Sequence, residues 1–297
     1  MNNSRVLVFR SIELSDPQFE TDNLRSITVK SPALGHRADI TVHATPRAHA
    51  TPDVPVVILL HGIQGSHWAW TQKAGAHRLN DALQLDAQFP AFVLAMPSDG
   101  LWGDGSGYVA HDEQNFERWI VEEVPAALSY AVPSVTRQSK IFIAGLSMGG
   151  FGALRLASEY PERFSGASAH SALTELAQLR RLVSEEISID TAPSVLASIL
   201  KNRERLSPFR FDCGQQDALL TANRALSLAL YSRGIPHRYE EFAGDHSWTY
   251  WGNQLERSLR FFAEILSTPP TVTPEEIRAA TAAVHCDRPD STTATVF

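Results

Sequence analysis

Hydrophobic residues fall into short continuous runs separated by longer stretches with helical spacing. Three runs, 54–60, 92–96 and 141–144, consist almost entirely of apolar residues, which is typical of strands buried on both faces of a sheet. Between the second and third runs, the stretch 114–132 has apolar residues every three or four positions, which predicts a helix. Strands that alternate with helices predict crossover units and a mostly parallel sheet.

The flanking segments extend this pattern. Two short alternating runs, 26–30 and 38–43, predict an antiparallel pair at the N-terminal edge of the sheet. Later segments predict two more strands, 208–212 and 236–242, and helices that pack over the sheet, at 151–159, 219–231 and 255–265. The expected fold is therefore an α/β fold with helices on both faces of a mostly parallel central sheet.

The same pattern predicts how the chain is divided. We expect an N-terminal extension at 1–24, an α/β domain at 25–267 and a polar C-terminal tail at 268–297 with a weak helix at 274–284. The stretch 172–206 is helical in pattern but lies between two predicted strands. It is either a small helical cap over the edge of the sheet or an ordinary crossover with extra helix.

The most specific motif is Gly145-Leu146-Ser147-Met148-Gly149. This G-x-S-x-G sequence directly follows a predicted buried strand and precedes a glycine-rich helix, which is the context of a nucleophile elbow. The turn is tight, so its glycines avoid clashes, and the backbone N–H of Met148 would point at a developing oxyanion. The alternative interpretation is that the glycines only allow close packing at the start of the helix.

Partners for a serine nucleophile follow in the order expected of a hydrolase, first an acid and then a histidine. Asp217 lies in the loop after the predicted strand 208–212, and Asp212, at the end of that strand, is the alternative acid. Of the 11 histidines, His246 is the one in the loop after the last predicted strand. We therefore predict Ser147, Asp217 and His246 as a catalytic triad.

Two loops would complete the site. The sequence His61-Gly62-Ile63-Gln64-Gly65 follows the first buried strand, where an amide N–H, here that of Ile63, supplies the second half of an oxyanion hole. The loop 98–108 should open on the same edge of the sheet. The expected pocket residues are Gly62, Gln64, Trp70, Asp99, Trp102, Tyr108, His170 and Trp248. For the four aromatic residues, packing within loops is an equally good reading.

Composition narrows the class of protein. The formal net charge is −7, with 26 basic and 33 acidic residues, and no basic cluster predicts nucleic-acid binding. No apolar run reaches the roughly 18–20 residues of a membrane-spanning helix. The two cysteines form no metal-binding or disulfide motif. We expect no metal and no cofactor. The N-terminus lacks the apolar run of a signal peptide, which predicts a cytoplasmic protein.

Several motifs together resemble the esterase D-type branch of the α/β-hydrolases. That branch includes S-formylglutathione hydrolases, carboxylesterases and feruloyl or acetyl-xylan esterases, with mycolyltransferase antigens more distant. The matching motifs are His61-Gly62-Ile63-Gln64-Gly65 with Trp70, Pro97-Ser98-Asp99-Gly100, Glu122-Glu123-Val124-Pro125, Gly145-Leu146-Ser147-Met148-Gly149-Gly150, Gly214-Gln215-Gln216-Asp217, and Gly244-Asp245-His246-Ser247-Trp248 with Trp251. The segment after Asp99 departs from S-formylglutathione hydrolases, and the C-terminal tail matches no part of the family.

The resemblance implies an α/β-hydrolase fold, the triad and oxyanion groups named above, and metal-free hydrolysis of an ester or thioester. We therefore expect a serine carboxylesterase that acts on a small-molecule ester. Three alternatives stay open: an acyltransferase with the same triad, a thioesterase like S-formylglutathione hydrolase, and a non-catalytic binding protein on a hydrolase fold. The sequence leaves the number of chains open, including a homo-oligomer.

Overall fold

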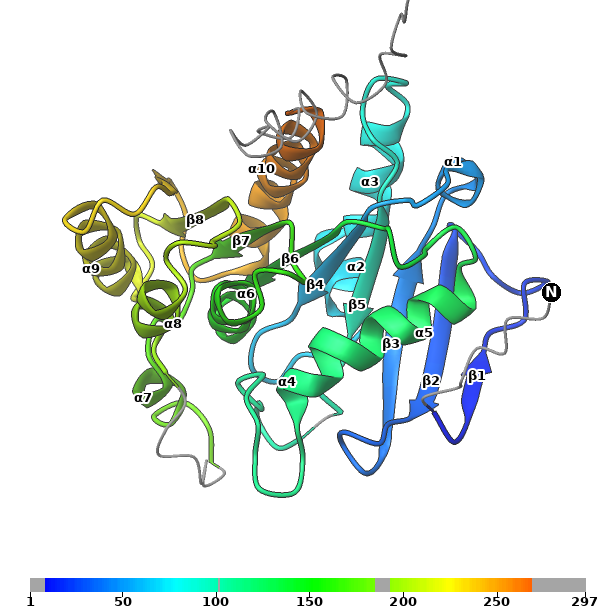
Figure 1. Cartoon of the computed structure of the whole chain (residues 1–297), viewed down its shortest axis with the longest axis horizontal. Coiled ribbons are helices and arrows are strands. Elements are labelled where there is room, and N and C mark those ends of the chain that lie inside the picture. The colour runs from blue at the N-terminus through cyan, green and yellow to red at the C-terminus, as the bar shows by residue number, and fades with distance from the viewer. Residues whose placement is uncertain (1–8, 101, 185–192, 269–297) are drawn as a thin grey trace, which may run out of the picture. The chain divides into compact units, whose positions relative to one another are not determined.

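A computed structural model describes residues 9–100, 102–184 and 193–268 of the chain. By its contacts the chain divides into two units, Met1–Ile265 and Leu266–Phe297. The first unit contains a nine-stranded sheet (Figure 1). Of the second unit, only residues 266–268 are described, so the predicted tail helix at 274–284 lies outside the described residues.

The sheet has the strand order β1-β2-β3-β5-β4-β6-β7-β8-β9. Neighbours from β1 to β3, and the pair β3 and β5, run antiparallel, whereas the strands from β5 to β9 in this order run parallel. The strands are β1 (Ile12–Leu14), β2 (Leu24–Lys30), β3 (Arg37–His43), β4 (Val56–Leu60), β5 (Val93–Pro97), β6 (Ile141–Leu146), β7 (Gly166–His170), β8 (Phe209–Gly214) and β9 (Arg238–Phe242).

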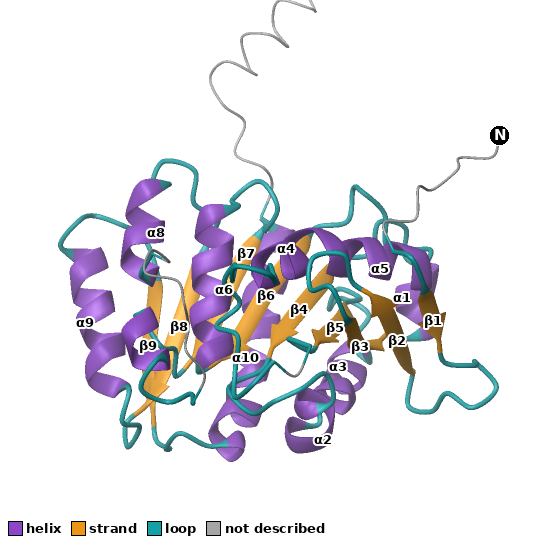
Figure 2. Cartoon of the chain, turned by 90° about the horizontal axis from the view of Figure 1, so that it is seen from below, coloured by secondary structure: helices purple, strands orange, loops and turns teal. Residues whose placement is uncertain are grey.

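Helices cover both faces of the sheet. One face carries α4, α5, α6, α8 and α9, and the opposite face carries α2, α3 and α10 (Figures 1 and 2). The helices are α1 (Pro46–Ala50), α2 (Ala69–Ala74), α3 (Ala76–Gln84), α4 (Phe116–Arg118), a π-helical segment (Trp119–Glu123), α5 (Val124–Ala131), α6 (Met148–Glu159), α7 (Leu176–Leu179), α8 (Val195–Lys201), α9 (Leu220–Tyr231) and α10 (Trp248–Ser267). The predicted α/β architecture with an antiparallel N-terminal edge is confirmed.

The central strands are apolar throughout because both of their faces are covered. Every residue of β4 and β5 is buried. Phe142 of β6 stacks on Phe262 of α10, with ring centroids 4.7 Å apart, while α6 packs on the other face of β6. An apolar run without alternation is therefore what this position in the sheet requires.

Three features differ from the expectation. The strand β7 was not predicted, because its residues Gly-Ala-Ser-Ala-His have low hydrophobicity although all five are buried. The sheet also begins earlier than expected, since β1 lies within the predicted extension 1–24 and pairs with β2. The helices α2 and α3, in the crossover from β4 to β5, were not predicted either.

The stretch 172–206 contains two short helices, α7 and α8. The helix α8 packs against α6 and α9 and connects the neighbouring strands β7 and β8, as a crossover helix does. Residues 185–192 of this stretch lie outside the described residues. In the described part of this stretch, the interpretation as an ordinary crossover accounts for α8.

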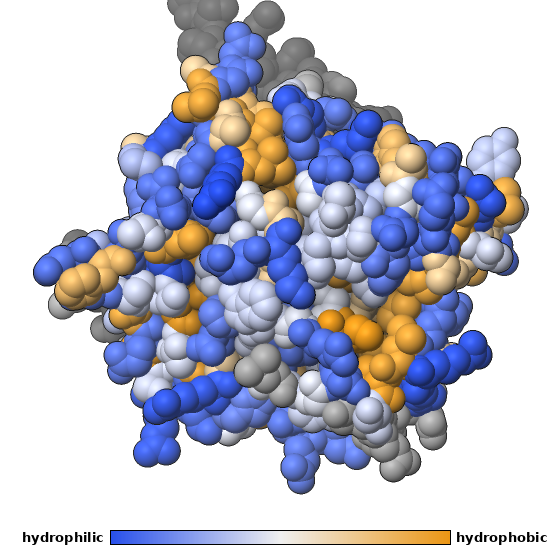
Figure 3. All heavy atoms as spheres, turned by 180° about the vertical axis from the view of Figure 1, so that it is seen from behind, coloured by the Kyte–Doolittle hydropathy of each residue, from blue (hydrophilic) through white to orange (hydrophobic). Residues whose placement is uncertain are grey.

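The face seen from behind is hydrophilic with several separate apolar patches (Figure 3). Among the described helices, none is long and apolar enough to cross a membrane.

The buried ring of Phe142 tests the core. Replacing Phe142, which is fully buried, by alanine removes its contacts with α10, and we expect the free energy of unfolding to fall by about 3–5 kcal/mol. Leu228→Ala on α9 is the control, because Leu228 is 69% exposed and its loss should change stability by about 0.5 kcal/mol or less. Urea denaturation of both variants measures the difference, and equal effects would contradict the assigned packing.

Candidate active site

Ser147 occupies a sharp turn between β6 and α6. Its backbone has φ 54° and ψ −118°, a conformation that costs a residue with a side chain on the order of 1–3 kcal/mol. A Cβ atom at Gly145 would lie 2.2 Å from the carbonyl oxygen of Gly149, and one at Gly149 would lie 2.4 Å from the carbonyl oxygen of Leu60. Backbone contacts this close explain why both flanking positions are glycine.

The structure brings Ser147, His246 and Asp217 together from three separate loops. The Nε2 atom of His246 lies 3.1 Å from Oγ of Ser147, and its Nδ1 atom lies 2.8 Å from Oδ2 of Asp217. This arrangement fits the tautomer in which Nδ1–H donates to the carboxylate and Nε2 accepts from the serine hydroxyl. Ser147 is only 2% exposed, whereas the imidazole of His246 is 36% exposed.

Hydrogen bonds directly join the loop that carries Asp217 to the loop that carries His246. The amide of Gln215 donates to the carbonyl of Phe242 at 2.8 Å, and the amide of Gln216 donates to the carbonyl of Gly244 at 2.9 Å. In return, the amide of Gly244 donates to Oε1 of Gln216 at 2.7 Å. The separation between Asp217 and His246 is therefore set by the pairing of β8 with β9 and its continuation into the loops.

Asp217 is held in its ionised form. Burial by itself would raise the pKa of Asp217, but hydrogen bonds from His246 and from the amide of Leu219 outweigh burial, so the pKa lies below its ordinary value. Asp212, the alternative acid, is fully buried and binds His170 and Tyr250 instead. Of the two candidates, Asp217 is the carboxylate that contacts His246.

The glycine-containing loop after β4 lies beside the serine. A Cβ atom at Gly62 would lie 3.5 Å from Cβ of Ser147. Among the hydrogen bonds found for the described residues, the amides of Ile63 and Met148 have no acceptor, whereas the next amide, that of Gln64, donates to the carbonyl of Asp104. Two neighbouring amide donors without a partner beside a serine suit an oxyanion.

The loop that follows β5 supports this corner. The amide of Asp99 donates to Nε2 of His61 at 3.3 Å, and the Tyr108 hydroxyl donates to the carbonyl of His61 at 3.1 Å. The amide of Gly107 lies 3.3 Å from Sδ of Met148. Asp99 and Tyr108, which were predicted to line the pocket, are buried and hold the loop 61–65 through His61.

The remaining predicted pocket residues separate into two groups. Trp70 and His170 are fully buried, and the indole N–H of Trp70 donates to the carbonyl of Leu60, so both belong to the packing and not to a pocket wall. Gln64 is exposed, and Trp102 and Trp248 are partly exposed. The ring of Trp102 packs against the ring of His111 at an interplanar angle of 45°, with centroids 4.4 Å apart.

Trp251 was not among the predicted pocket residues, although it belongs to the motif that follows His246. Its ring meets the ring of His246 edge to face, with centroids 4.8 Å apart, and Trp248 contacts Trp251 in the same way. Lys73 lies over the rings of Trp248 and of the exposed Trp68. Trp251 follows Trp248 by three positions on one helix, which places both on the same face, and this spacing was the signal that could have identified Trp251.

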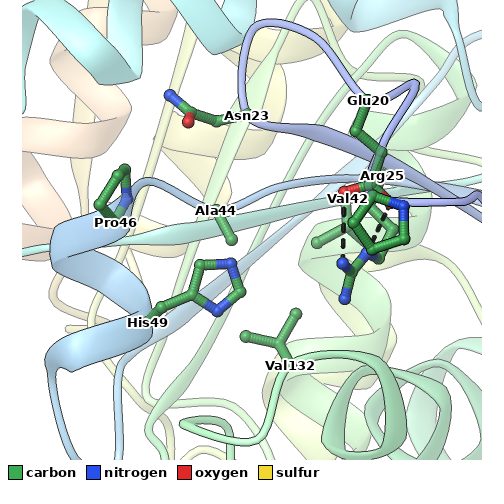
Figure 4. A pocket seen from close by; sticks show the side chains of 9 residues that line it. Glu20, Asn23, Arg25, Val42, Ala44, Pro46, His49 and Val132 are labelled. Atoms are coloured by element: carbon green, nitrogen blue, oxygen red, sulfur yellow. Dashed lines mark hydrogen bonds and ion pairs between the residues drawn. The ribbon is translucent and has the colours of Figure 1, made fainter.

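Two hollows in the structure lie away from these side chains. One of about 220 Å³ lies at the opposite edge of the sheet, beside Arg25, His49 and Val132 (Figure 4). Its Arg25 is paired with Glu20 at 2.8 Å. The second, of about 450 Å³, is lined by α7, α8 and α9. Neither hollow is lined by Ser147, Asp217 or His246, so neither one is the candidate active site.

Within the described residues, no group of three or more histidine, cysteine or acidic side chains could hold a metal ion. The buried thiol of Cys213 is unpaired, and burial together with the nearby Asp217 raises its pKa to about 12. This cysteine is therefore a packing residue and not a nucleophile at neutral pH.

Comparison with known proteins agrees with this geometry. The family described as "Putative esterase" matches residues 31–262, which is more than half of the chain. The chain belongs to this family. The predicted class of activity is therefore confirmed: the chain is an esterase, which hydrolyses carboxylic esters. The alternative of a non-catalytic binding protein is not supported.

Individual relatives are distant. An acetyl esterase of Caldicellulosiruptor saccharolyticus is 26% identical over 236 residues, which are 72% of this chain and 85% of the relative. The fluorophosphonate-binding serine hydrolase F of Staphylococcus aureus has a TM-score of 0.67 at 21% identity, over 80% of this chain and 97% of that chain. The S-formylglutathione hydrolase of Agrobacterium tumefaciens has a TM-score of 0.67 at 20% identity, over 87% and 99%. These structures share the α/β-hydrolase fold.

The depressed pKa of Asp217 predicts how stability depends on pH. A carboxylate with a lowered pKa contributes stability above its ordinary pKa of about 3.9, and the contribution is lost as the pH falls through the folded-state value. We therefore expect the difference in unfolding free energy between the wild type and Asp217→Asn to be largest above pH 5 and to shrink toward pH 2. Urea denaturation across this range measures it, and a difference independent of pH would contradict the assigned contact.

Proposed function

We propose that the esterase cleaves short-chain acyl esters, with Ser147 as nucleophile, His246 as general base and Asp217 as the carboxylate that orients His246. The observation that carries this proposal is the continuous hydrogen-bonded series from Ser147 Oγ through the imidazole to Asp217. The amides of Ile63 and Met148 are proposed as the oxyanion hole. The protein is further predicted to act in the cytoplasm and without a cofactor.

The mechanism follows from these positions. His246 takes the proton of Ser147 as its oxygen attacks the ester carbonyl, and Asp217 stabilises the imidazolium that forms. The oxyanion accepts hydrogen bonds from the two amides, each of which contributes about 3 kcal/mol to stabilisation of the transition state. The imidazolium then protonates the leaving alcohol. Water attacks the acyl-enzyme with His246 again as base, which releases the acid and restores the serine.

The close packing beside Ile63 and Met148 supports a short acyl group. A Cβ atom at Gly105 would lie 2.5 Å from Sδ of Met148 and 3.2 Å from Cγ2 of Ile63, so the loop after β5 closes this corner from one side. The acetyl esterase relative supports the same choice. A thioester leaving group would be accepted by the same chemistry.

Hydrolysis of p-nitrophenyl esters tests the nucleophile and the chain length. We expect kcat/KM to fall at least tenfold from the acetate to the octanoate, and Ser147→Ala to lose activity at least about a thousandfold. Mass spectrometry after reaction with a fluorophosphonate should show one adduct, on Ser147. Activity that persists in Ser147→Ala, or an adduct elsewhere, would reject the proposed nucleophile.

The final acceptor of the acyl group separates a hydrolase from a transferase. Because His246 is 36% exposed to solvent, we expect water to reach the acyl-enzyme and to be the main acceptor. Product analysis in the presence of added short alcohols at millimolar concentration should then show the free acid as the major product. A new ester as the major product would favour the acyltransferase with the same triad.

A further inference from the structure

A second set of polar side chains lies buried beneath the loops that carry Ser147, Asp217 and His246. Its centre is the carboxylate of Asp212, which is completely buried. One oxygen, Oδ2, lies 2.9 Å from Nδ1 of His170 and 2.9 Å from Nη1 of Arg210. The other, Oδ1, accepts from the hydroxyl of Tyr250 at 2.8 Å. We call Asp212, His170, Arg210 and Tyr250 the Asp212 cluster.

Part of this cluster, together with Ser258, repeats the atom order of Ser147, His246 and Asp217. Nε2 of His170 lies 3.0 Å from Oγ of Ser258, so serine, histidine and aspartate follow one another as at Ser147. The repeat cannot act on a substrate, because His170, Asp212 and Ser258 all have zero exposure. Ser258 also lies within α10 and shares its hydroxyl with Ser168. The cluster therefore acts on other parts of the protein and not on a ligand.

The first of these parts is the nucleophile elbow. The carbonyl of His170 accepts from the amide of Ser147 at 3.0 Å, and the amide of Ser171 donates to the carbonyl of Asp212 at 2.8 Å. The amide of Leu173 donates to the carbonyl of Ser147 at 3.1 Å. The end of β7 thus holds the amide of Ser147, the segment that follows β7 holds its carbonyl, and the side chain of His170 is held by Asp212.

The other two loops start from the same cluster. Asp212 lies on β8, which leads through Gly214 into the loop that carries Asp217. The ring of Tyr250 lies against Gly244, where an added Cβ would be 2.6 Å from Cδ2 of the ring. Gly244 has φ +138° and lies two residues before His246. One carboxylate therefore contacts groups that adjoin each of the three loops.

Charge makes these contacts strong. Burial by itself would raise the pKa of Asp212, but His170, Arg210 and Tyr250 outweigh burial and the pKa lies below its ordinary value. Hydrogen bonds to a buried ionised group are stronger than those between neutral groups, and the loss of one partner leaves the others unsatisfied. Catalytic groups in turn tolerate only displacements that are well below 1 Å.

We propose that Asp212 is a positioning residue that sets the geometry of Ser147, His246 and Asp217 through the side chains of His170 and Tyr250. The inference rests on the proposed function of those three residues. It differs from an ordinary stabilising role in one respect: weakening the cluster changes the catalytic step more than it changes substrate binding or the stability of the fold.

Asp212→Asn and Tyr250→Phe test this role with p-nitrophenyl acetate. For Asp212→Asn we expect kcat to fall at least tenfold with KM within twofold of the wild type, and a parallel fall in the rate of fluorophosphonate labelling at Ser147. Tyr250→Phe removes a single hydrogen bond and should lower kcat at least threefold at nearly unchanged Tm. If Asp212→Asn does not fold, Tyr250→Phe alone decides.

Glu123→Gln is the matched control. Glu123 is another buried carboxylate. It accepts hydrogen bonds from the hydroxyl of Ser31 and from the amide of Ala33, and neither of these partners belongs to the triad. We expect it to lower Tm without lowering kcat. The low-field proton resonance of the His246–Asp217 hydrogen bond should shift in Asp212→Asn and stay in place in Glu123→Gln.

Two results would separate the possible failures. Wild-type kcat in Tyr250→Phe, or losses of kcat in Asp212→Asn no larger than those in Glu123→Gln at equal loss of Tm, would overturn the positioning role while the triad stands. Full activity of Ser147→Ala in the same assay would instead overturn the proposed function on which the inference rests.

Discussion

The strained backbone at Ser147 is the constraint on which the rest of the site depends. A residue with a side chain holds φ 54° here only because the surroundings leave no alternative. The glycines on either side allow β4, β6 and α6 to approach within contact distance of the backbone. The end of β7 holds the amide of Ser147, and Leu173, in the segment after β7, holds its carbonyl. The hydroxyl of Ser147 is thereby held at the carboxyl edge of the sheet with its position already determined.

This esterase contains two aspartate–histidine pairs with the same chemical groups, and their different burial gives them different roles. In the pair of His246 and Asp217 the carboxylate is buried but the imidazole is partly exposed, beside a serine with a special backbone conformation. The pair of His170 and Asp212 lies in the core, where every polar atom of the carboxylate is occupied. A buried carboxylate with three partners is fixed in place and can hold the neighbouring loops in position. A partly exposed imidazole can instead exchange protons with a substrate.

Most of the fold followed from local patterns in the sequence. Runs such as Val56–Leu60 and Ile141–Leu146 are apolar because both faces of the sheet are covered, so they are visible without a structure. The strand Gly166–His170 was not visible, because small residues were selected there by close packing and not by hydrophobicity: a Cβ atom at Gly150 of α6 would contact Ala169 and Ala172. Short helices such as α2 carry too few residues to produce a clear period.

The site shows the same division. The elbow motif and the order of serine, acid and histidine along the chain are properties of the sequence, and they predicted Ser147 and His246, which the structure places within 3.1 Å of each other. Between Asp212 and Asp217 the sequence expressed only a preference, because five residues of spacing do not determine the direction of a side chain. The tertiary structure decided that question: the pairing of β8 with β9 and the loop hydrogen bonds that follow it direct Asp217 to His246, while Arg210 and Tyr250 retain Asp212 in the core.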